Sequence, residues 1–373
     1  MANLRIGICG WGNVATGLYE QLVSGNSVYS ELELCCIGAR RDNPRCNPAS
    51  TKIIRDIFAV VEEDIDVLVE LIGGVDIARE LILSALKSGK HVVTANKAVI
   101  FEHGEELIEA AKNNNVRLLF ESAVCAGTPT IKILSNDLGA NKISKVAGML
   151  NGTTNFILSN MEERARYEDV LQEAKDKGFA EPDPSLDVNG TDAAHKIGIL
   201  AALLFNSGLP ANNFYIEGIE KISPQDFNHA DEFNFTIKHL AVTQIQKNGI
   251  ELRSHPVMLE KESSLAGLKG VRNGIQFDTD LLGEFHVAGS GAGRESTASG
   301  LISDLIALLK NNDSEPMKYP NFSNKPSIIN FDELKFKYYV YLEVKNESGV
   351  LALISKIFAD HKISFDKIIQ KDQ

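Results

Sequence analysis

The most chemically suggestive feature of the sequence is a charged pair on a helix that is otherwise apolar. Asp192 and Lys196 lie four residues apart, so on a helix they share a face and can touch. Most other residues of segment 192–204 are apolar, which is typical of a helix in a protein interior. An ordinary ion pair near a helix start would explain this spacing. A pair held away from water could instead transfer a proton.

The loop before this helix is crowded with acidic side chains. It contains Glu181, Asp183 and Asp187, interrupted by prolines and followed by Gly190. A stiff loop of like charges beside a half-buried pair costs desolvation and repulsion unless a cation binds there. We therefore expect the loop to bind a substrate that carries an ammonium group, such as an amino acid.

Lys97 is a second candidate for chemistry. It stands in "VVTANKA", at the carboxyl end of a predicted parallel strand. Ligands of open α/β sheets bind at that edge, so Lys97 could face a ligand. A surface lysine at a helix start is the alternative interpretation.

A glycine-rich turn follows the first apolar run of the chain. Gly10, Gly12 and Ala15 have the G-x-G-x-x-G/A spacing between a predicted strand and a predicted helix. Gly10 permits the tight turn, Gly12 lets the backbone approach a pyrophosphate, and Ala15 allows close packing. Together with Asn13 and Val14 they are predicted to bind a dinucleotide at the helix N-terminus. A purely structural turn is the alternative.

The end of the second predicted strand discriminates between cofactors. An enzyme that uses NAD usually has Asp or Glu there, whereas this chain reads Gly38-Ala39-Arg40-Arg41. A small residue followed by arginines leaves room for a 2′-phosphate and offers it a bidentate partner. The sequence therefore favours NADP. Asp42 could still reach a ribose, which leaves NAD open, and a solvated basic loop is the bland interpretation.

Two patterns of elements must position these residues. Over residues 1–140, short apolar runs alternate with helical patterns, which predicts an α/β, Rossmann-type doubly wound sheet covered on both faces. Over residues 141–310, a strand, three helical stretches and several strands at hairpin spacing predict an α+β substrate and dimerisation domain with an open, mainly antiparallel sheet. A last helix around residues 294–310 is expected to complete the first domain.

The C-terminal segments are predicted to be a linker and a partial domain. Residues 311–335 are polar and contain several prolines, as linkers do. Residues 336–373 have the pattern strand, turn, amphipathic helix, strand. This βαβ piece ends before it could bury a core of its own.

The composition excludes several classes of protein. A net charge of −12 over 373 residues, without a basic stripe, argues against nucleic acid or an anionic membrane surface as a partner. No apolar run reaches the roughly 18 residues that a membrane helix needs. The five cysteines form no CxxC pair and suit neither a disulfide framework nor a zinc site. We expect a cytoplasmic protein.

Four motifs carry a resemblance to a known family. The segments "GWGNVATG", "GKHVVTANKA", "NGTTNFIL" and above all "GFAEPDPSLDVNGTDAAHK" together resemble homoserine dehydrogenase, over about residues 4–310. The resemblance implies NADPH- or NADH-dependent reduction of L-aspartate 4-semialdehyde to L-homoserine, in threonine, methionine and isoleucine biosynthesis. It also implies a homodimer or homotetramer.

The resemblance implies roles for residues at matching motif positions. Asp192 and Lys196 match the family's catalytic pair, with Lys196 as proton donor and Asp192 beside the substrate, either orienting that lysine or relaying its proton. Lys97 matches a catalytic lysine that contacts both cofactor and substrate. Glu181 and Asp187 match the acidic residues that hold the substrate's amino group.

Backbone contacts and a bound cation are implied as well. Gly178 and Gly293 match glycines where the backbone approaches the bound substrate and cofactor. A monovalent cation, usually sodium, is held in the family by a loop that matches "ESAVCAGT". Its ligands, mainly backbone carbonyl oxygens, would come from Glu121, Val124, Ala126 and Thr128.

The tail resembles the first half of an ACT regulatory domain. Asn346 and Ser348 stand where the usual Asp and Pro precede Gly-Val, and the second half of the domain does not follow. Threonine feedback is therefore not implied, and the fragment could instead pair with a partner subunit's copy.

Two rival functions are open at this point. One is an aspartate-semialdehyde dehydrogenase that uses Cys125 as an acylated nucleophile, although the expected histidine pattern is not present around it. A small buried apolar residue is the plain interpretation of Cys125. The other rival is a non-catalytic NADP-binding regulatory protein, which would leave Asp192, Lys196 and Lys97 without a task.

Overall fold

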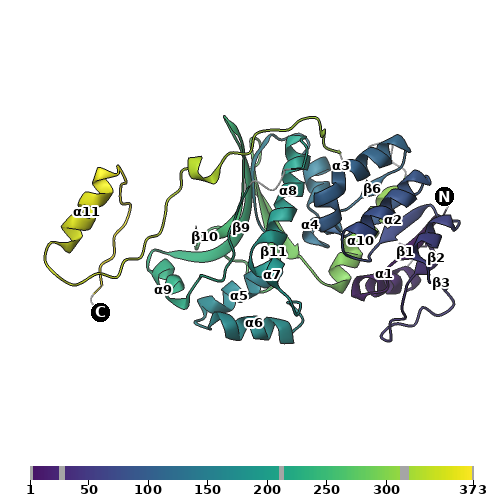
Figure 1. Cartoon of the computed structure of the whole chain (residues 1–373), viewed down its shortest axis with the longest axis horizontal. Coiled ribbons are helices and arrows are strands. Elements are labelled where there is room, and N and C mark those ends of the chain that lie inside the picture. The colour runs from purple at the N-terminus through teal and green to yellow at the C-terminus, as the bar shows by residue number, and fades with distance from the viewer. Residues whose placement is uncertain (1–2, 25–29, 210–213, 311–318, 372–373) are drawn as a thin grey trace. The chain divides into compact units, whose positions relative to one another are not determined.

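The computed structural model describes residues 3–24, 30–209, 214–310 and 319–371 and divides into two units. The larger unit, Met1–Glu333, contains two six-stranded sheets, and the smaller unit is Leu334–Gln373. Figure 1 shows the sheets and the helices that cover them.

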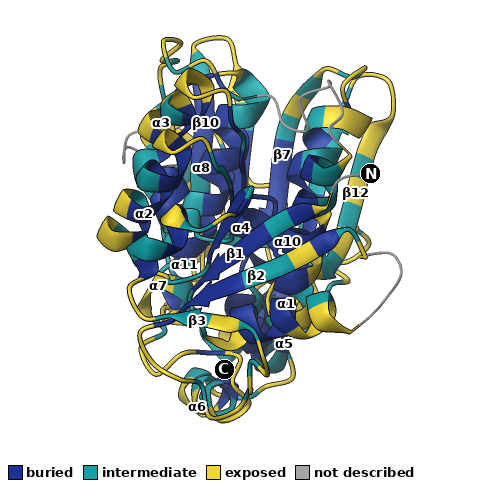
Figure 2. Ribbon diagram, turned by 90° about the vertical axis from the view of Figure 1, so that its right-hand side faces the viewer, coloured by how far each residue is buried: buried dark blue, intermediate teal, exposed yellow. Residues whose placement is uncertain are grey.

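The first sheet is parallel throughout, in the order β3-β2-β1-β4-β5-β6. This is the usual strand order of a dinucleotide-binding Rossmann sheet, which confirms the predicted fold class. The strands consist mainly of Val, Ile and Leu, because both faces of such a sheet are buried (Figure 2). Their bounds are β1 Leu4–Cys9, β2 Leu32–Gly38, β3 Lys52–Ile54, β4 Val67–Glu70, β5 His91–Thr94 and β6 Leu118–Leu119.

Two helix pairs cover this sheet. α1 packs on α10, and α2 packs on α3. A Cβ placed on Gly17 would lie 2.7 Å from Arg294 Cγ, so glycine is what lets α1 approach α10 this closely. The predicted helix near residues 294–310 therefore does pack on the first sheet. The bounds are α1 Asn13–Val23, η2 Ile57–Glu62, α2 Asp76–Lys87, α3 Lys97–Asn113 and α10 Arg294–Leu309.

The second sheet has the order β12-β11-β7-β9-β10-β8. All its pairs are antiparallel except β8, which runs parallel to β10, so the prediction of a mainly antiparallel sheet is confirmed. The strands are β7 Ile143–Met149, β8 Tyr215–Ile216, β9 Phe235–Gln246, β10 Gly249–Glu260, β11 Arg272–Thr279 and β12 Gly283–Ser290.

One helix connects the two sheets physically. α8, Thr191–Phe205, contacts α3 and α4 on one side and β9 and β10 on the other. His195 on this helix stacks on Phe101 of α3, with ring centroids 4.3 Å apart. The other helices of this region are α4 Ser122–Cys125, the π-helix η3 Ile133–Asp137, α5 Gly152–Glu162, α6 Tyr167–Asp176, α7 Ser185–Val188 and α9 Pro224–Glu232.

The predicted linker is only partly a linker. Residues 311–318 lie outside the described residues, but residues 319–333 belong to the larger unit. The Tyr319 hydroxyl bonds both backbone groups of Leu118, and Ile329 N donates to Ile250 O. Polar and proline-rich composition favours irregular backbone, but it does not prevent that backbone from packing.

Of the βαβ pattern predicted for the tail, the helix forms but the prediction of two strands is wrong. Helix α11, Val350–Asp360, forms as predicted after Gly349. No strand is assigned in the described part of the smaller unit, where the sequence pattern suggests one on each side of the helix. A strand needs a hydrogen-bonded neighbour and a core, and side chains such as Tyr338, Leu353 and Ile369 are exposed.

Membrane-spanning helices are not found among the described residues, where every helix is too short or too polar to cross a bilayer.

Candidate active site

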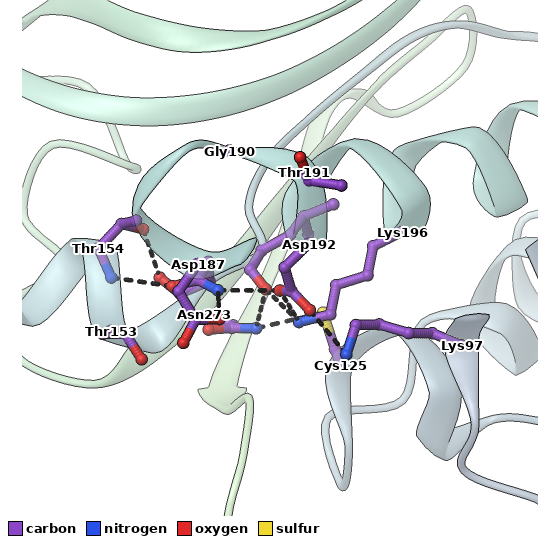
Figure 3. A network of polar contacts seen from close by, with 12 residues as sticks. Lys97, Cys125, Thr153, Thr154, Asp187, Gly190, Thr191, Asp192, Lys196 and Asn273 are labelled. Carbon is purple, nitrogen blue, oxygen red and sulfur yellow. Dashed lines mark hydrogen bonds and ion pairs between the residues drawn. The ribbon is translucent and has the colours of Figure 1, made fainter. Parts of the chain in front are cut away.

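Asp192 forms the centre of a buried polar cluster (Figure 3). Its Oδ1 lies 2.8 Å from Lys97 Nζ and its Oδ2 lies 2.7 Å from Lys196 Nζ. The Asp192 side chain is only 6% exposed, and that of Lys97 is 37% exposed. The structure thus joins the two lysines that the sequence singles out separately through one carboxylate.

Two helix starts bring these side chains together. Asp192 is in the first turn of α8, which begins at Gly190 in a left-handed conformation with φ 86°. Lys97 is the first residue of α3, whose N-cap Asn96 accepts a hydrogen bond from Val99 N. A lysine at a helix N-terminus opposes the helix dipole, whereas an aspartate there is favoured. The ion pair with Asp192 offsets the unfavourable position of Lys97.

Lys196 has two fixed acceptors. Besides Asp192, its ammonium donates to Leu150 O at 2.7 Å, just after β7. An ammonium has three N–H donors, so one remains for a third acceptor. The side chain is 11% exposed, which leaves it little freedom to take another position.

Asn151 holds the acidic groups together. Its amide nitrogen donates to Asp187 Oδ1 at 2.7 Å and to Asp192 Oδ2 at 2.9 Å. Its amide oxygen accepts from Thr154 N at 2.8 Å and so caps α5. The cap fixes which way the amide faces, because a flipped amide would turn its oxygen toward two carboxylates. Asn151 lies in the motif "NGTTNFIL", but its bridging role could not be read from the spacing.

Burial and the lysines shift the pKa values of this cluster. Burial pushes the pKa of Asp192 up, but Lys196 and Lys97 outweigh it and hold that pKa below its ordinary value. Burial pulls the pKa of Lys97 down, but Asp192 outweighs it and the net shift is upward. Burial raises the pKa of Asp187, against the hydrogen bond from Asn151. The aspartate between the lysines is therefore ionised and Lys97 is protonated at neutral pH.

The acidic loop reaches this cluster only in part. Asp187 joins it through Asn151 and is half-buried. Glu181 is exposed and acts on Lys97 electrostatically, without a direct ion pair among the described contacts. Asp183 is exposed and bonds Ser185 N within the loop. Gly178, with φ 71°, is exposed on the turn after α6 and has no contact with Lys97 or Lys196 among the described interactions.

The glycine-rich turn has the geometry expected for a dinucleotide. Gly10 has φ 109°, and a Cβ there would lie 2.3 Å from Leu71 O. Gly12 is the N-cap of α1, and a Cβ there would meet nothing within 4 Å. The start of α1, with Asn13 exposed and Val14 half-buried, is open while buried Ala15 packs inward. Backbone N–H groups at an open helix start suit a phosphate.

A pocket of about 300 Å³ lies beside this turn. Arg40 and Arg41 are exposed next to its wall. Asp42, which could have reached a ribose, is paired instead with Arg55 at 2.7 Å. The pocket is lined by Trp11, Ala39, Asp42, Asn43, Cys46, Asn47, Pro48 and Ile53.

The loop matching "ESAVCAGT" is held by a buried charge network. The Glu121 carboxylate accepts from Thr130 N, Ile131 N and Lys132 N at 2.7–2.9 Å, which holds its side chain toward the segment after the loop. Asp304 accepts from Glu121 N and pairs with Lys132 at 2.9 Å.

The backbone of that loop turns sharply at Ala126, with φ 49° and ψ −107°. Alanine disfavours this conformation, so the surrounding fold must impose it. The loop also contains Val124 and Thr128, and the Thr128 hydroxyl donates to Ser290 O at 3.1 Å. No cluster of three or more His, Cys, Asp or Glu side chains suited to a metal occurs among the described residues.

Cys125 is a buried thiol. It is 0% exposed, and burial raises its pKa, so it is not a thiolate at neutral pH. A neutral thiol closed off from solvent is a poor nucleophile. The plain interpretation of Cys125 as a small buried residue is confirmed, and its burial weakens the case for the acylating rival.

Gly293 stands apart from the lysine cluster. It is the exposed N-cap of α10, with φ 112°, and follows Gly291, which packs on Asn273. Asn273 lies in the Lys196 network, because its amide nitrogen donates to Leu150 O at 3.0 Å. Asn273 has no motif signal in the sequence, and only strand pairing reveals its place.

Comparison with known proteins identifies both parts of the chain. A family model described as the homoserine dehydrogenase NAD-binding domain matches residues 10–121, and one described as homoserine dehydrogenase matches residues 129–306. The homoserine dehydrogenase of Pseudomonas aeruginosa is 40% identical over 100% of this chain and 89% of its own length. That of Neisseria gonorrhoeae is 37% identical with the same coverage.

Solved structures agree with these matches. A homoserine dehydrogenase from Thiobacillus denitrificans superposes with a TM-score of 0.89 and 34% identity, over 100% of this chain and 89% of that one. A hyperthermophilic archaeal homoserine dehydrogenase in complex with NADPH has a TM-score of 0.70 and 30% identity, over 83% of this chain and 98% of that one.

Proposed function

Because the chain belongs to the homoserine dehydrogenase family of NAD(P)-dependent oxidoreductases, we propose that its Lys97–Asp192–Lys196 cluster reduces L-aspartate 4-semialdehyde to L-homoserine. The observation that carries this proposal is the Asp192 carboxylate, which binds both lysines beside an acidic loop. A buried site with two cations can stabilise an oxygen that gains negative charge, and the acidic loop can hold an ammonium.

In the proposed mechanism, the nicotinamide supplies hydride to the aldehyde carbon when it is bound. Lys196 donates the proton to the developing alkoxide through its remaining N–H. Asp192 and the Leu150 carbonyl keep the Lys196 ammonium in place, and Asp192 remains ionised while the proton is transferred. Lys97 adds a second positive charge without having to give up its proton.

The proposed substrate site uses the acidic side of the cluster. Asp187 and Glu181 hold the substrate's ammonium, and Gly178 and Gly293 offer backbone close to the ligands. Two facts support this assignment: Asn151 directs Asp187 toward Asp192, and Glu181 is close enough to act on Lys97 electrostatically. A cation in this place also relieves the repulsion between the carboxylates.

The proposed cofactor is NADP, bound over Gly10, Gly12, Asn13, Val14 and Ala15. Arg40 and Arg41 are exposed at the pocket, where they can pair with a 2′-phosphate. The ion pair between Asp42 and Arg55 weakens the case for NAD, because Asp42 would have to leave Arg55 to bind a ribose hydroxyl. NADPH in the archaeal relative supports the same choice.

A monovalent cation, with sodium as the expected ion, is part of the proposal. Carbonyl oxygens of Glu121, Val124, Ala126 and Thr128 would hold it, as hard oxygen donors do. The fit is supported by the negative charge beneath the loop, where Asp304 pairs with the Lys132 ammonium and the Glu121 carboxylate accepts from backbone N–H groups of residues 130–132. A bound cation would fix the loop rather than take part in proton transfer.

We also propose the biological setting of the enzyme. Its product would be used in threonine, methionine and isoleucine biosynthesis in the cytoplasm. The enzyme would act as a homodimer or homotetramer. Residues 336–373 are proposed to be an ACT-like fragment that pairs with a second copy. Light scattering of the whole chain, with and without residues 336–373, tests the assembly.

The experiment that tests the proposed reaction is a coupled measurement of cofactor and product. Wild-type protein is expected to oxidise NADPH when L-aspartate 4-semialdehyde is added, with one L-homoserine formed for each NADPH consumed. A protein that binds NADPH but leaves it unoxidised would be the regulatory rival. In a separate incubation with NADP and inorganic phosphate, formation of an acyl phosphate with reduction of NADP would instead support the semialdehyde dehydrogenase rival.

A further inference from the structure

Asn273 is a fully buried amide that none of the proposed roles uses. It is the second residue of β11 and is 0% exposed. Its neighbour Gly274 pairs with Met149 of β7, which places Asn273 beside Leu150, where β7 has just ended. The Asn273 amide nitrogen donates to Leu150 O at 3.0 Å. Figure 3 shows Asn273 in the same network as Asp192 and Lys196.

The Leu150 carbonyl therefore has two donors. Asn273 Nδ2 lies 3.0 Å from it and Lys196 Nζ lies 2.7 Å from it. A carbonyl oxygen has two lone pairs, so these donors saturate it. The position of the carbonyl, and with it the direction of the Lys196 ammonium, depends on the Asn273 amide.

The turn after β12 holds this amide in place. A Cβ added to Gly291 would lie only 1.8 Å from Asn273 Cγ, so the backbone of that turn lies directly on the amide plane. On another side the amide nitrogen approaches Cys125 Sγ at 3.8 Å. Rotation of the amide is blocked by neighbours on three segments.

The orientation of the amide also has a chemical reason. A flipped amide would turn its oxygen toward the Leu150 carbonyl, which is repulsive. In the observed orientation Oδ1 has no hydrogen-bond partner among the described residues. A buried unsatisfied oxygen lowers stability and calls for an explanation, and a positioning task supplies one.

We infer that Asn273 is a positioning residue that fixes the Leu150 carbonyl and thereby aims the Lys196 ammonium at the substrate oxygen. The inference rests on the proposed function, because it gives Lys196 the part of proton donor. Asn273 itself touches neither substrate nor cofactor in this account.

Asn273→Asp tests this directly, because its two protonation states behave differently. A neutral carboxylic acid can still donate to Leu150 O through its O–H, whereas a carboxylate cannot donate and attracts the Lys196 ammonium instead. The described contacts link position 273 to the Cys125 thiol on α4 and, through the shared Leu150 carbonyl, to Lys196 on α8, which pairs with Asp192. The variant should therefore work at low pH and fail as the new acid ionises.

The expected result is a loss of kcat with rising pH that wild type does not show. At the high-pH limit kcat should be about 30-fold below wild type, with recovery at low pH, and KM for the semialdehyde within about threefold. The matched control is Asn155→Asp. Asn155 is also a buried asparagine and donates to the neighbouring Arg272 O at 3.1 Å, but among the described hydrogen bonds it has none with Lys196 or with Leu150 O.

A second variant without a new charge separates the loss of positioning from misfolding caused by a buried carboxylate. Asn273→Ser cannot reach Leu150 O and adds no buried charge, so it should lower kcat at every pH while NADPH still binds. Wild-type kcat and pH profile in both Asn273 variants would overturn the inference, as would the same profile in Asn155→Asp. If wild type itself fails to turn over, the proposed function is what has failed, and this inference falls with it.

Discussion

The Asp192 carboxylate bridges two lysine ammonium groups, 2.8 Å from Lys97 and 2.7 Å from Lys196. Lys97 begins α3 and Lys196 is on α8, so the bridge also ties the helix of the first sheet to the helix that packs on the second. One carboxylate therefore sets the geometry of both candidate catalytic lysines.

Asp192→Asn should lower both stability and activity. Removing the charge leaves two ammonium groups close together in a buried place, and breaking a buried pair costs about 3–5 kcal/mol. The folded state holds the pKa of Asp192 below its ordinary value. The pair therefore stabilises the fold above the unfolded pKa of about 3.9, and this stability is lost as pH falls through the folded pKa.

Thermal unfolding from pH 7 to pH 3 measures this effect. The difference in Tm between wild type and Asp192→Asn should be constant at neutral pH and shrink below about pH 4. A matched control is Asp183→Asn, which removes an exposed carboxylate of the same loop. A Tm difference for Asp192→Asn that grows as pH falls would contradict the ion-pair account.

Asn151→Leu should weaken substrate binding more than turnover. The amide nitrogen of Asn151 keeps Asp187 and Asp192 together, and loss of this donor raises the pKa of Asp187 further above its ordinary value. KM for the semialdehyde should rise about tenfold or more, and most steeply at low pH, where Asp187 becomes protonated. Initial rates between pH 5.5 and 8 test this, and a kcat effect larger than the KM effect would refute it.

Alanine substitutions at the two glycines of the cofactor turn should affect different properties, namely stability for one and NADPH binding for the other. Gly10→Ala places a Cβ 2.3 Å from Leu71 O at φ 109°, so it should lower Tm. Gly12→Ala meets no protein atom within 4 Å, so the fold should keep its Tm. The added methyl group would instead block the pyrophosphate, and NADPH should bind at least about tenfold more weakly. Calorimetric melting and NADPH titration separate the two, and equal losses of Tm would contradict this account.

Arg40→Ala and Arg41→Ala should change the choice of cofactor. If the arginines pair with a 2′-phosphate, their removal should raise KM for NADPH roughly tenfold and leave KM for NADH nearly unchanged. Arg166→Ala, which removes an exposed arginine that pairs with Asp169 at the start of α6, is the control. Equal effects on NADPH and NADH would mean that the arginines do not read the phosphate.

Much of the fold could be predicted because it follows from side-chain periodicity. The parallel sheet, the glycine turn and the buried helix with Asp192 and Lys196 all leave local patterns in the sequence. The short strand β3 and the packing of residues 319–333 leave no such pattern. The strands expected in the tail have the pattern but not the paired neighbour that a strand needs.

The site could be predicted only where the type and spacing of its side chains form a pattern in the sequence. Lys97 could be singled out from its place after a strand, but its contact with Asp192 depends on how α3 meets α8. The Leu150 carbonyl is a backbone group and so has no sequence signal at all. Asn273 comes from a distant strand, and only the pairing of β11 with β7 reveals that it belongs to the Lys196 network.

The most direct test of the central claim is kcat of Lys196→Ala for NADPH-dependent reduction of L-aspartate 4-semialdehyde, next to wild type and Lys177→Ala. Lys177 also forms an ion pair with a carboxylate four residues away, Glu173, but on the surface of the molecule. We predict a loss of about 10²–10⁴-fold in kcat for Lys196→Ala, with NADPH binding retained, and wild-type rates for Lys177→Ala. A Lys196→Ala enzyme that turns over at the wild-type rate would contradict the account.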